Sequence, residues 1–518
     1  METARVLARA LPVLLACALA TPVAGAALAA PPIAWEHLFG GDGPDIARSA
    51  DRTTDGGYIL LGETYSSASG DVAGTNHGMW DLWVVKLRGN GTVQWQRLLG
   101  GSRDDRAQAI RGTPDGGCIV LGTTFSNASG DIAGTTHGNL DTWVVKLDAA
   151  GGIQWQRLIG GDWNDGGTTI ELTADGGYVL LGETDSSESG DVTVKNHGRS
   201  DVWVLKLDVG GATQWQRQYG GEYWETGTQV RQTADGGYLV TAGTQERNGV
   251  VSELYDVWLL RLDQNGLLLW EKILGGSGNE YGGIALPTAD GGYLVAATTE
   301  SSANGDVTPT NHGGYDVWVV RLDGPREVRW EGLYGGSGWD RLSAVRSTAD
   351  GGCVLLGETD SSASGNVTGT NHGQNDLWTV KLGAGGAVEW QRLYGGDGNE
   401  RAADLLQTAD GGYLLLGTST SSASGDVAAF GHGAEEVWAV RLDRGFAAVP
   451  GGVGMPTDTV GIGYCDDING NGRADFADVV LYFNRMSWID ENEPISAFDY
   501  NGNGRIDFAD VVLLFRYL

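Results

Sequence analysis

Apolar and polar positions recur in a fixed order along this chain, and the second copy of the order is typical. Residues 106–111 alternate between apolar and polar, 118–121 and 142–147 are almost continuously apolar, and 153–159 alternates again. Alternation predicts a strand with one buried face, whereas a short apolar run predicts a strand buried on both faces. Turns rich in Asp and Gly separate these segments, so each copy predicts four short antiparallel strands.

The copies follow one another at a nearly constant spacing. An Asp-Gly-Gly triplet begins at Asp55, Asp115, Asp175, Asp235, Asp290, Asp350 and Asp410. A phrase of the type Asp-Leu-Trp-Val-Val-Lys-Leu follows each triplet, centred on Trp83, Trp143, Trp203, Trp258, Trp318, Trp378 and Trp438. The period is 60 residues, with a single step of 55. A fixed period of this size indicates one structural unit repeated seven times.

The two ends of the repeat region predict how it closes. The last copy supplies only three strands, the third of them at 437–442, whereas 34–39 is a lone strand of the fourth type. Pairing these two segments would close a ring and remove its exposed edges. We therefore predict an all-β fold, a seven-bladed β-propeller over residues 31–446 with N-to-C strand closure. An open β-solenoid is the alternative, but it leaves the lone strand unexplained.

The repeat also resembles a known group of proteins. Its phrases Asp-Gly-Gly-Tyr, Asp-x-Trp-x-x-Lys-Leu and Trp-x-x-x-x-Gly-Gly resemble those of secreted β-propeller repeat proteins, over residues 34–443. The resemblance implies a scaffold found in many exported proteins rather than one activity. The fourth copy departs from the pattern, because it is five residues shorter and its loop, 245–255, lacks the phrase found in the others.

Charge and the first residues suggest where the protein acts. The net charge of −32 argues against nucleic acid or an anionic membrane as a partner and suits a secreted protein that binds cations. Residues 1–30 have the form of a signal peptide, with Arg5 and Arg9 before an apolar run and small residues. A retained membrane anchor, or lipid attachment at Cys17, is the alternative. No later stretch is long and apolar enough to span a bilayer.

Two sets of residues fall on the face of the predicted propeller that carries the long loops. A carboxylate follows each Gly-Gly pair by four residues, at Asp45, Asp105, Asp165, Glu225, Glu280, Asp340 and Glu400. These residues are expected to form a ring near the mouth of the channel. The ring would bind a cation or a polyhydroxyl ligand, or its members would accept backbone N–H groups within each turn. Sevenfold repetition favours the structural role.

Aromatic residues in the same loops do not follow the repeat. They are Trp163, Tyr223, Trp224, Tyr281 and Trp339, with Trp80, Tyr255 and Tyr315 ahead of the third strands. Residues that break the symmetry of a repeat are better candidates for function than those that obey it. Exposed aromatic rings beside carboxylates suit sugar rings, through stacking and hydrogen bonds to hydroxyls. Ordinary packing between blades is the alternative.

Six histidines, each followed by Gly, occupy one loop phrase: His77, His137, His197, His312, His372 and His432. One histidine per blade is too dispersed for a shared metal site, so we interpret them as residues that fold the loop. A calcium ion in each loop, held by Asp71 and its equivalents, is the alternative, and Asn366 in the sixth copy argues against it. No catalytic motif is present, although paired carboxylates can hydrolyse glycosides.

The pattern changes after Asp443. A Gly- and Pro-rich linker, 447–462, leads to a domain at 463–518 with two calcium-binding loops that begin 32 residues apart. Their ligand positions are Asp467, Asn469, Asn471, Arg473, Asp475 and Asp478, and then Asp499, Asn501, Asn503, Arg505, Asp507 and Asp510, with each Arg offering its backbone carbonyl. Gly472 and Gly504 permit the sharp turn. We expect two bound Ca²⁺ ions, with helices at 476–486 and 508–517.

This pair of loops resembles a dockerin, the module that docks onto a cohesin in secreted or cell-surface complexes. It shares Asp at position twelve and helices only after the loops. Positions ten and eleven differ, because Phe476-Ala477 and Phe508-Ala509 stand where well-studied bacterial dockerins tend to carry hydroxyl residues. The form is closer to that seen in archaeal secreted proteins. The resemblance implies a cohesin-like partner.

Together these features predict a secreted or cell-surface binding and assembly protein that is not an enzyme. Carbohydrate is the expected ligand of the loop face, and a cohesin-like protein is the expected partner of the tail. One alternative is a polysaccharide-acting enzyme, a glycoside hydrolase or lyase, recruited by its dockerin. A close carboxylate pair on one blade, unmatched in the others, would indicate it. The other alternative is a structural spacer of the cell envelope.

Overall fold

A computed structural model describes residues 30–247, 250–444, 464–469, 473–493 and 495–517. The expected signal peptide (apart from Ala30), the linker and Asn471 lie outside the described residues.

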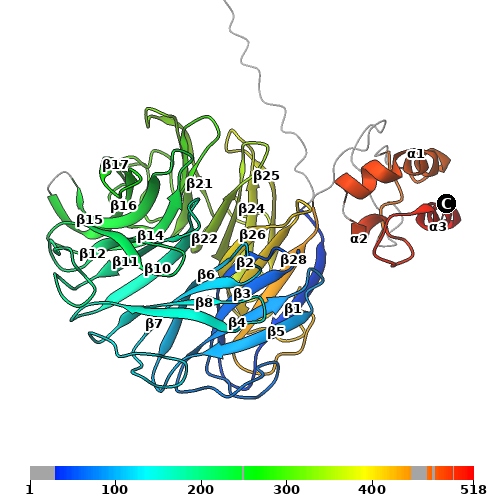
Figure 1. Cartoon of the computed structure of the whole chain (residues 1–518). Coiled ribbons are helices and arrows are strands. Elements are labelled where there is room, and N and C mark those ends of the chain that lie inside the picture. The colour runs from blue at the N-terminus through cyan, green and yellow to red at the C-terminus, as the bar shows by residue number, and fades with distance from the viewer. Residues whose placement is uncertain (1–29, 248–249, 445–463, 470–472, 494, 518) are drawn as a thin grey trace, which may run out of the picture.

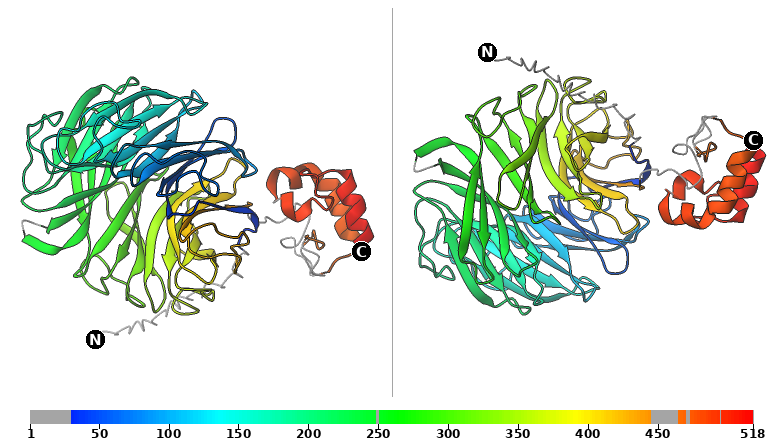
Figure 2. Two further views of the ribbon diagram at one scale, coloured as in Figure 1. Left: turned by 90° about the horizontal axis from the view of Figure 1, so that it is seen from below. Right: turned by 90° about the horizontal axis from the view of Figure 1, so that it is seen from above.

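The repeats form seven four-stranded antiparallel sheets arranged around one axis (Figures 1 and 2). The seven blades consist of the following strands: β2 (Asp45–Arg52), β3 (Tyr58–Thr64), β4 (Asp81–Leu87) and β5 (Val93–Leu99); β6 (Asp105–Gly112), β7 (Cys118–Thr124), β8 (Asp141–Leu147) and β9 (Ile153–Ile159); β10 (Asp165–Leu172), β11 (Tyr178–Thr184), β12 (Asp201–Leu207) and β13 (Thr213–Tyr219); β14 (Glu225–Gln232), β15 (Tyr238–Arg247), β16 (Val250–Leu262) and β17 (Leu268–Leu274); β18 (Glu280–Pro287), β19 (Tyr293–Thr299), β20 (Asp316–Leu322) and β21 (Val328–Tyr334); β22 (Asp340–Ser347), β23 (Cys353–Thr359), β24 (Asp376–Leu382) and β25 (Val388–Tyr394); β26 (Glu400–Gln407), β27 (Tyr413–Ser419), β28 (Glu436–Leu442) and β1 (Ile33–Phe39).

The last blade is completed by the first strand of the chain. Its strand order is β1-β28-β27-β26, and β1 pairs antiparallel with β28 so that Leu38 lies opposite Trp438. In Figure 1 the blue β1 lies beside the orange β28. The predicted N-to-C closure is thereby confirmed, and the open solenoid is excluded.

The repeated tryptophan of each third strand explains why its phrase recurs. Trp83 is buried on β4, and its indole N–H donates to Gln96 Oε1 on the neighbouring β5 at 2.9 Å. The same bond forms in every blade, and in the last one Trp438 donates to Glu36 of β1. A buried indole therefore fills the space between blades while its one polar atom stays satisfied.

The short fourth blade differs in its connection. Its second and third strands, β15 and β16, extend into a hairpin in which Glu246 pairs with Val251, where the other blades have a long loop. The fourth copy is five residues shorter than the others because this hairpin replaces the long loop.

The C-terminal part contains α1 (Phe476–Asn492), α2 (Ile495–Phe498) and α3 (Phe508–Tyr517). Helix α1 was expected to end at Met486, and that boundary is wrong because Ile489 is fully buried in the core of this domain and extends the apolar face. Asp475 caps α1 by accepting the Ala477 N–H, in a capping box with Asp478. None of the helices in the described ranges is long and apolar enough to cross a membrane.

Replacing Trp143 with Ala tests the role of the buried indole. Trp143 is 0% exposed, so we expect the free energy of unfolding to fall by about 3–5 kcal/mol. The matched change Trp163→Ala removes an indole that is 66% exposed and should alter it by less than about 0.5 kcal/mol. Urea unfolding followed by circular dichroism measures both, and equal losses would contradict this account of the packing.

Candidate functional site

The seven carboxylates are the first residues of the innermost strands, and they are buried rather than open to the channel. Each is at most 1% exposed. In the first blade, Asp45 Oδ2 accepts the Gly41 N–H at 2.7 Å and the Ser66 hydroxyl at 3.0 Å, and Oδ1 accepts the Thr64 hydroxyl. The Gly N–H bond recurs in all the other blades. These side chains join the two loops of each blade, so we assign them no ligand.

Burial changes how these carboxylates titrate. Loss of solvent raises the pKa of Asp105 and of Glu225 to about 6, although hydrogen bonds to each oppose the change. The pKa of Glu280 is raised to about 7, chiefly by burial and further by its hydrogen bond with Asp256. Near pH 5, Asp105, Glu225 and Glu280 therefore hold protons that the same side chains would largely release in the unfolded chain.

The repeated histidines also act within their loops. His77 Nδ1 lies 2.7 Å from Asp81 Oδ2, and its backbone N–H donates to the same oxygen at 3.0 Å. The ring contact recurs at His197, His312 and His372. Asp131, the equivalent of Asp71 in the second blade, is engaged by Arg97 and lies 3.8 Å from His77 Nε2. These contacts are those of residues that fold the loop and link neighbouring blades.

Of the five candidate aromatic residues, the structure brings two into one cluster. Tyr281 and Trp339 join Tyr255 and Tyr315 in a row of rings whose successive centroids are 6.4, 6.2 and 5.2 Å apart, in the order Tyr255, Tyr281, Tyr315, Trp339. We call these four residues the aromatic row. It crosses from the fourth blade to the sixth, and Trp339 at its end is 51% exposed.

Two charged residues that the sequence did not single out border the aromatic row. The Arg341 guanidinium lies 4.9 Å from the Trp339 ring centroid and 5.2 Å from that of Tyr315. Glu300 accepts the Asn279 side-chain N–H at 2.8 Å, and its carboxylate also raises the pKa of Tyr315 through a hydrogen bond. Arg341 lies on β22 and Glu300 directly follows β19, so only the fold shows that both border the aromatic row.

The remaining candidates lie apart from the row. Trp163 is exposed and Tyr223 is half-buried. Trp224 is exposed and is covered on one face by the Arg199 guanidinium at 4.1 Å from its ring centroid. The five residues therefore do not form one surface.

The fourth blade contains a carboxylate pair that the other blades lack. A cavity of about 560 Å³ there is lined by Glu225, Glu246 and Glu271, together with Arg247 and Lys272. Glu246 occupies the position of Ser66, and its backbone N–H donates to Thr244 as that of Ser66 does to Thr64. In place of a hydroxyl donor, Glu225 thus faces a second charge, which contributes to its raised pKa.

The second calcium loop is described completely, and its donors suit a hard cation. Asp499 accepts the N–H groups of Asn503 and Gly504, and Asp510 accepts those of Asn501 and Asp507. Gly504 has φ +78°, the left-handed conformation that the sharp turn requires. Burial raises the pKa of Asp510, and the charges of Asp499 and Asp507 raise it further. A divalent cation would offset this repulsion.

The first loop has the same arrangement where it is described. Asp478 accepts the N–H groups of Asn469 and Asp475, as Asp510 does in the second loop. Within the described ranges, no three His, Cys, Asp or Glu side chains are placed to hold a metal ion by themselves. Loops of this kind complete their donor set with Asn side chains and backbone carbonyls.

Helices α1 and α3 together form an exposed apolar groove of about 410 Å³, which we call the helix groove. Each helix contributes the same four residues in the same order: Phe476, Val479, Val480 and Phe483 from α1, and Phe508, Val511, Val512 and Phe515 from α3. The phenylalanines contact each other crosswise, Phe476 with Phe515 and Phe483 with Phe508. All four are more than half exposed, which is typical of an interaction surface.

Comparison with known proteins identifies the C-terminal domain. The family model for the dockerin type I domain matches residues 466–518, so the chain ends in a domain of this calcium-binding family. The Regulatory protein FlaEY of Caulobacter vibrioides is 23% identical over 407 residues, which cover 70% of this chain and 41% of that protein. The chain thus spans about two fifths of that relative's length.

Solved structures resemble the chain only distantly. A protein of unknown function from Dyadobacter fermentans is 11% identical, with a TM-score of 0.41 over 79% of this chain and 98% of that one. The hydrazine synthase of Kuenenia stuttgartiensis is 11% identical, with a TM-score of 0.42 over 73% and 94%. The assignment of the propeller rests on its own sheet topology.

The buried carboxylates predict an unusual dependence of stability on pH. Since the pKa values of Asp105, Glu225 and Glu280 are raised in the folded state, their contribution is complete below the unfolded pKa values of 3.8 and 4.5 and is lost as the pH rises through about 7. With calcium saturating, the urea midpoint should therefore fall between pH 5 and about pH 8. Glu280→Gln should reduce this slope, and Glu188→Gln, at an exposed site, should not. Identical slopes in all three proteins would contradict the prediction.

Proposed function

We propose that this protein is a secreted or cell-surface assembly component whose dockerin domain attaches the propeller to a cohesin-like partner. The observation that carries the proposal is the helix groove, an apolar surface built twice from the same residues on a dockerin type I domain. A propeller joined to such a domain is placed on a larger assembly without taking part in the docking itself.

Two Ca²⁺ ions would hold the two loops in the form that supports the groove. The first would be bound by Asp467, Asn469, Asn471, Asp475, Asp478 and the Arg473 carbonyl, and the second by Asp499, Asn501, Asn503, Asp507, Asp510 and the Arg505 carbonyl. With three carboxylates and two Asn per loop, we expect dissociation constants of roughly 10⁻⁵ to 10⁻³ M. Each helix starts inside its own loop, so calcium binding and the position of the phenylalanines are coupled.

The phenylalanines determine what kind of partner surface would fit. Phe476 and Phe508 replace the hydroxyl residues typical of well-studied bacterial dockerins, and both line the helix groove. We therefore expect a cohesin-like partner that contributes apolar side chains at this contact. Since α1 and α3 present the same residues, either half of the groove offers the partner an equivalent surface.

Replacing Phe483 and Phe515 with Ser tests the docking surface. Each removes an exposed aromatic anchor of the groove, and such anchors contribute about 2 kcal/mol or more, so the pair should weaken partner binding by at least about a hundredfold. Surface plasmon resonance against a panel of cohesin domains measures the affinity, with and without a calcium chelator, which should abolish binding. Phe430→Ser, at a 79% exposed position on the propeller, is the control. Unchanged affinity of the double variant would exclude the groove.

We further propose that the loop face of the propeller binds carbohydrate at the aromatic row. Its rings offer stacking surfaces, and Arg341 and Glu300 supply the charged donor and acceptor that sugar hydroxyls require. The row breaks the sevenfold symmetry, unlike the carboxylates and histidines of the same face.

A polysaccharide and glycan array, read together with an assay for released sugar, tests this second proposal. Tyr281→Ser and Trp339→Ser should each lower binding by about tenfold, since an aromatic–sugar contact is lost. Trp163→Ser, at an exposed site outside the row, should not. Released sugar would instead favour the enzyme alternative, with Glu225 and Glu246 as the pair to replace. Neither binding nor release would favour a structural spacer.

A further inference from the structure

The innermost strands carry a second ring of residues, which differs from the buried carboxylate ring because its residue types vary from blade to blade. It is formed by the seventh residue of each strand, near the face that carries the Asp-Gly-Gly turns: Asp51, Arg111, Glu171, Arg231, Leu286, Arg346 and Leu406. We call these seven residues the channel tier. Their chemistry changes from blade to blade, so the repeat alone does not account for them.

A chain of polar contacts follows this tier from the sixth blade to the third. Arg346 Nη2 donates to Asp404 Oδ1 at 2.6 Å, and the Ser49 hydroxyl donates to Asp404 Oδ2 at 3.1 Å. Arg111 Nη1 contacts the Ser49 hydroxyl at 3.4 Å, while its Nη2 donates to Glu171 Oε1 at 2.9 Å. Each guanidinium in this part of the tier is therefore matched by a carboxylate.

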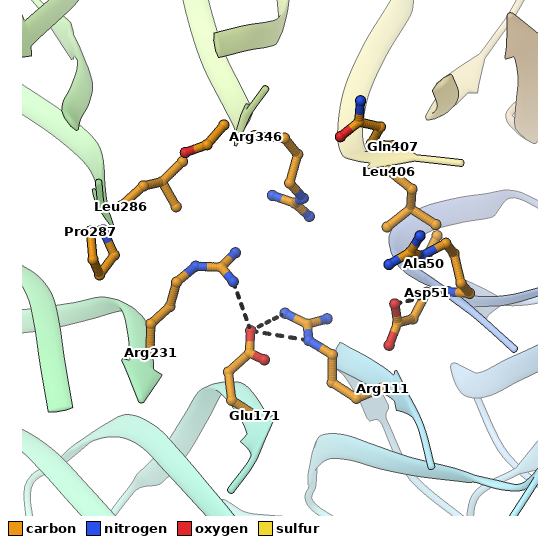
Figure 3. Close-up of a pocket in the computed structure, with 12 residues that line it drawn as sticks. Ala50, Asp51, Arg111, Glu171, Arg231, Leu286, Pro287, Arg346, Leu406 and Gln407 are labelled. Carbon is orange, nitrogen blue, oxygen red and sulfur yellow. Dashed lines mark hydrogen bonds and ion pairs between the residues drawn. The ribbon is translucent and has the colours of Figure 1, made fainter. Parts of the chain in front are cut away.

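The chain of contacts is weakest at Arg231 (Figure 3). Its nearest carboxylate oxygen, Glu171 Oε1, is 3.9 Å away and is already engaged by Arg111, and its Nε has no hydrogen-bond partner among the described residues. The next position is Leu286, and the one after it is Arg346. Two guanidinium groups thus flank an apolar gap and both point into the cavity (Figure 3).

Electrostatics supports this description of the gap. Burial lowers the pKa of Arg231, and the charge of Arg346 lowers it further, beyond what Glu171 offsets. The Arg231 side chain is 27% exposed, and its one long ion pair is to a carboxylate that it shares with Arg111, so a bound anion would add to its charge compensation. The chain as a whole carries a net charge of −32, so a concentration of arginines inside its channel is not the result of a surplus of basic residues.

The cavity has the size and walls of a site for a small molecule. Its volume is about 490 Å³, within the range of ligand pockets. Leu286, Pro287 and Leu406 form apolar walls, and the exposed Arg52 and Ser347 lie among the lining residues. The pocket therefore combines paired cations with an apolar surface, and it lies at the end of the channel opposite the loop face.

We propose that this pocket binds a small organic anion whose carboxylate or phosphate group bridges Arg231 and Arg346 above Leu286. A guanidinium offers two parallel N–H donors that match either group. The rest of the ligand, about the size of a sugar acid or a sugar phosphate, contacts Leu286, Pro287 and Leu406. The site is separate from the aromatic row and does not depend on the function proposed for it.

Calorimetry with the full chain at low ionic strength and saturating calcium tests the proposal. The probes are glucuronate, glucose 6-phosphate, inorganic phosphate and neutral glucose. We expect glucuronate or glucose 6-phosphate to bind and glucose not to bind, and the comparison of the two acids distinguishes a carboxylate from a phosphate ligand. Binding of glucose with equal affinity, of inorganic phosphate alone, or of no probe at about 10 mM would overturn the proposal.

Variants locate the binding in the gap. Arg231→Gln and Arg346→Gln should each weaken binding by at least about tenfold, whereas Arg157→Gln, at an exposed site on β9 outside the pocket, should leave it unchanged. Leu286→Glu introduces a carboxylate between the two arginines and should abolish binding while raising the melting temperature. This variant keeps both arginines, so its result does not depend on whether the arginine variants fold. Full binding by the folded Leu286→Glu protein would place the ligand elsewhere.

Discussion

The pairing of β1 with β28 is the contact on which the rest of the propeller depends. It joins residues about four hundred positions apart, and it gives the last blade its fourth strand and Trp438 its hydrogen-bond acceptor, Glu36. Without it, β28 would be an exposed edge, and the first and last blades would be held only by their face-to-face packing and contacts such as the bond from Ser49 to Asp404. The loop face and the channel tier are both circular arrangements, so both exist only because the ring is closed.

Repetition separates residues that build the ring from residues that are free to do something else. The repeated carboxylates and tryptophans are buried and hydrogen-bonded, and the repeated histidines contact carboxylates of their own and of neighbouring blades. Among the residues that vary, Tyr281 and Trp339 of the aromatic row are exposed, and Arg231 of the channel tier has a buried Nε with no hydrogen-bond partner among the described residues. Packing imposes the same constraints on every blade. A residue that is found in one blade alone is therefore not required by those constraints and is a better candidate for function.

The C-terminal domain is stabilised differently from the propeller. Its small core is assisted by two loops of closely spaced carboxylates, which repel one another until a cation is bound. The proposed calcium binding would therefore be linked to folding of this domain, and the apolar helix groove is the surface that the folded domain exposes.

The sequence by itself determined the number of blades, the strand closure and the dockerin character of the C-terminal domain, because period, alternation and motif spacing are local properties of the chain. It did not determine that the carboxylate ring is buried, that Tyr281 and Trp339 meet while Trp163 lies apart, or that α1 continues to Asn492. Those features depend on which loops and strands become neighbours. The unmatched Arg231 is the clearest case, since its partners come from other blades and only the closed ring shows which one is missing.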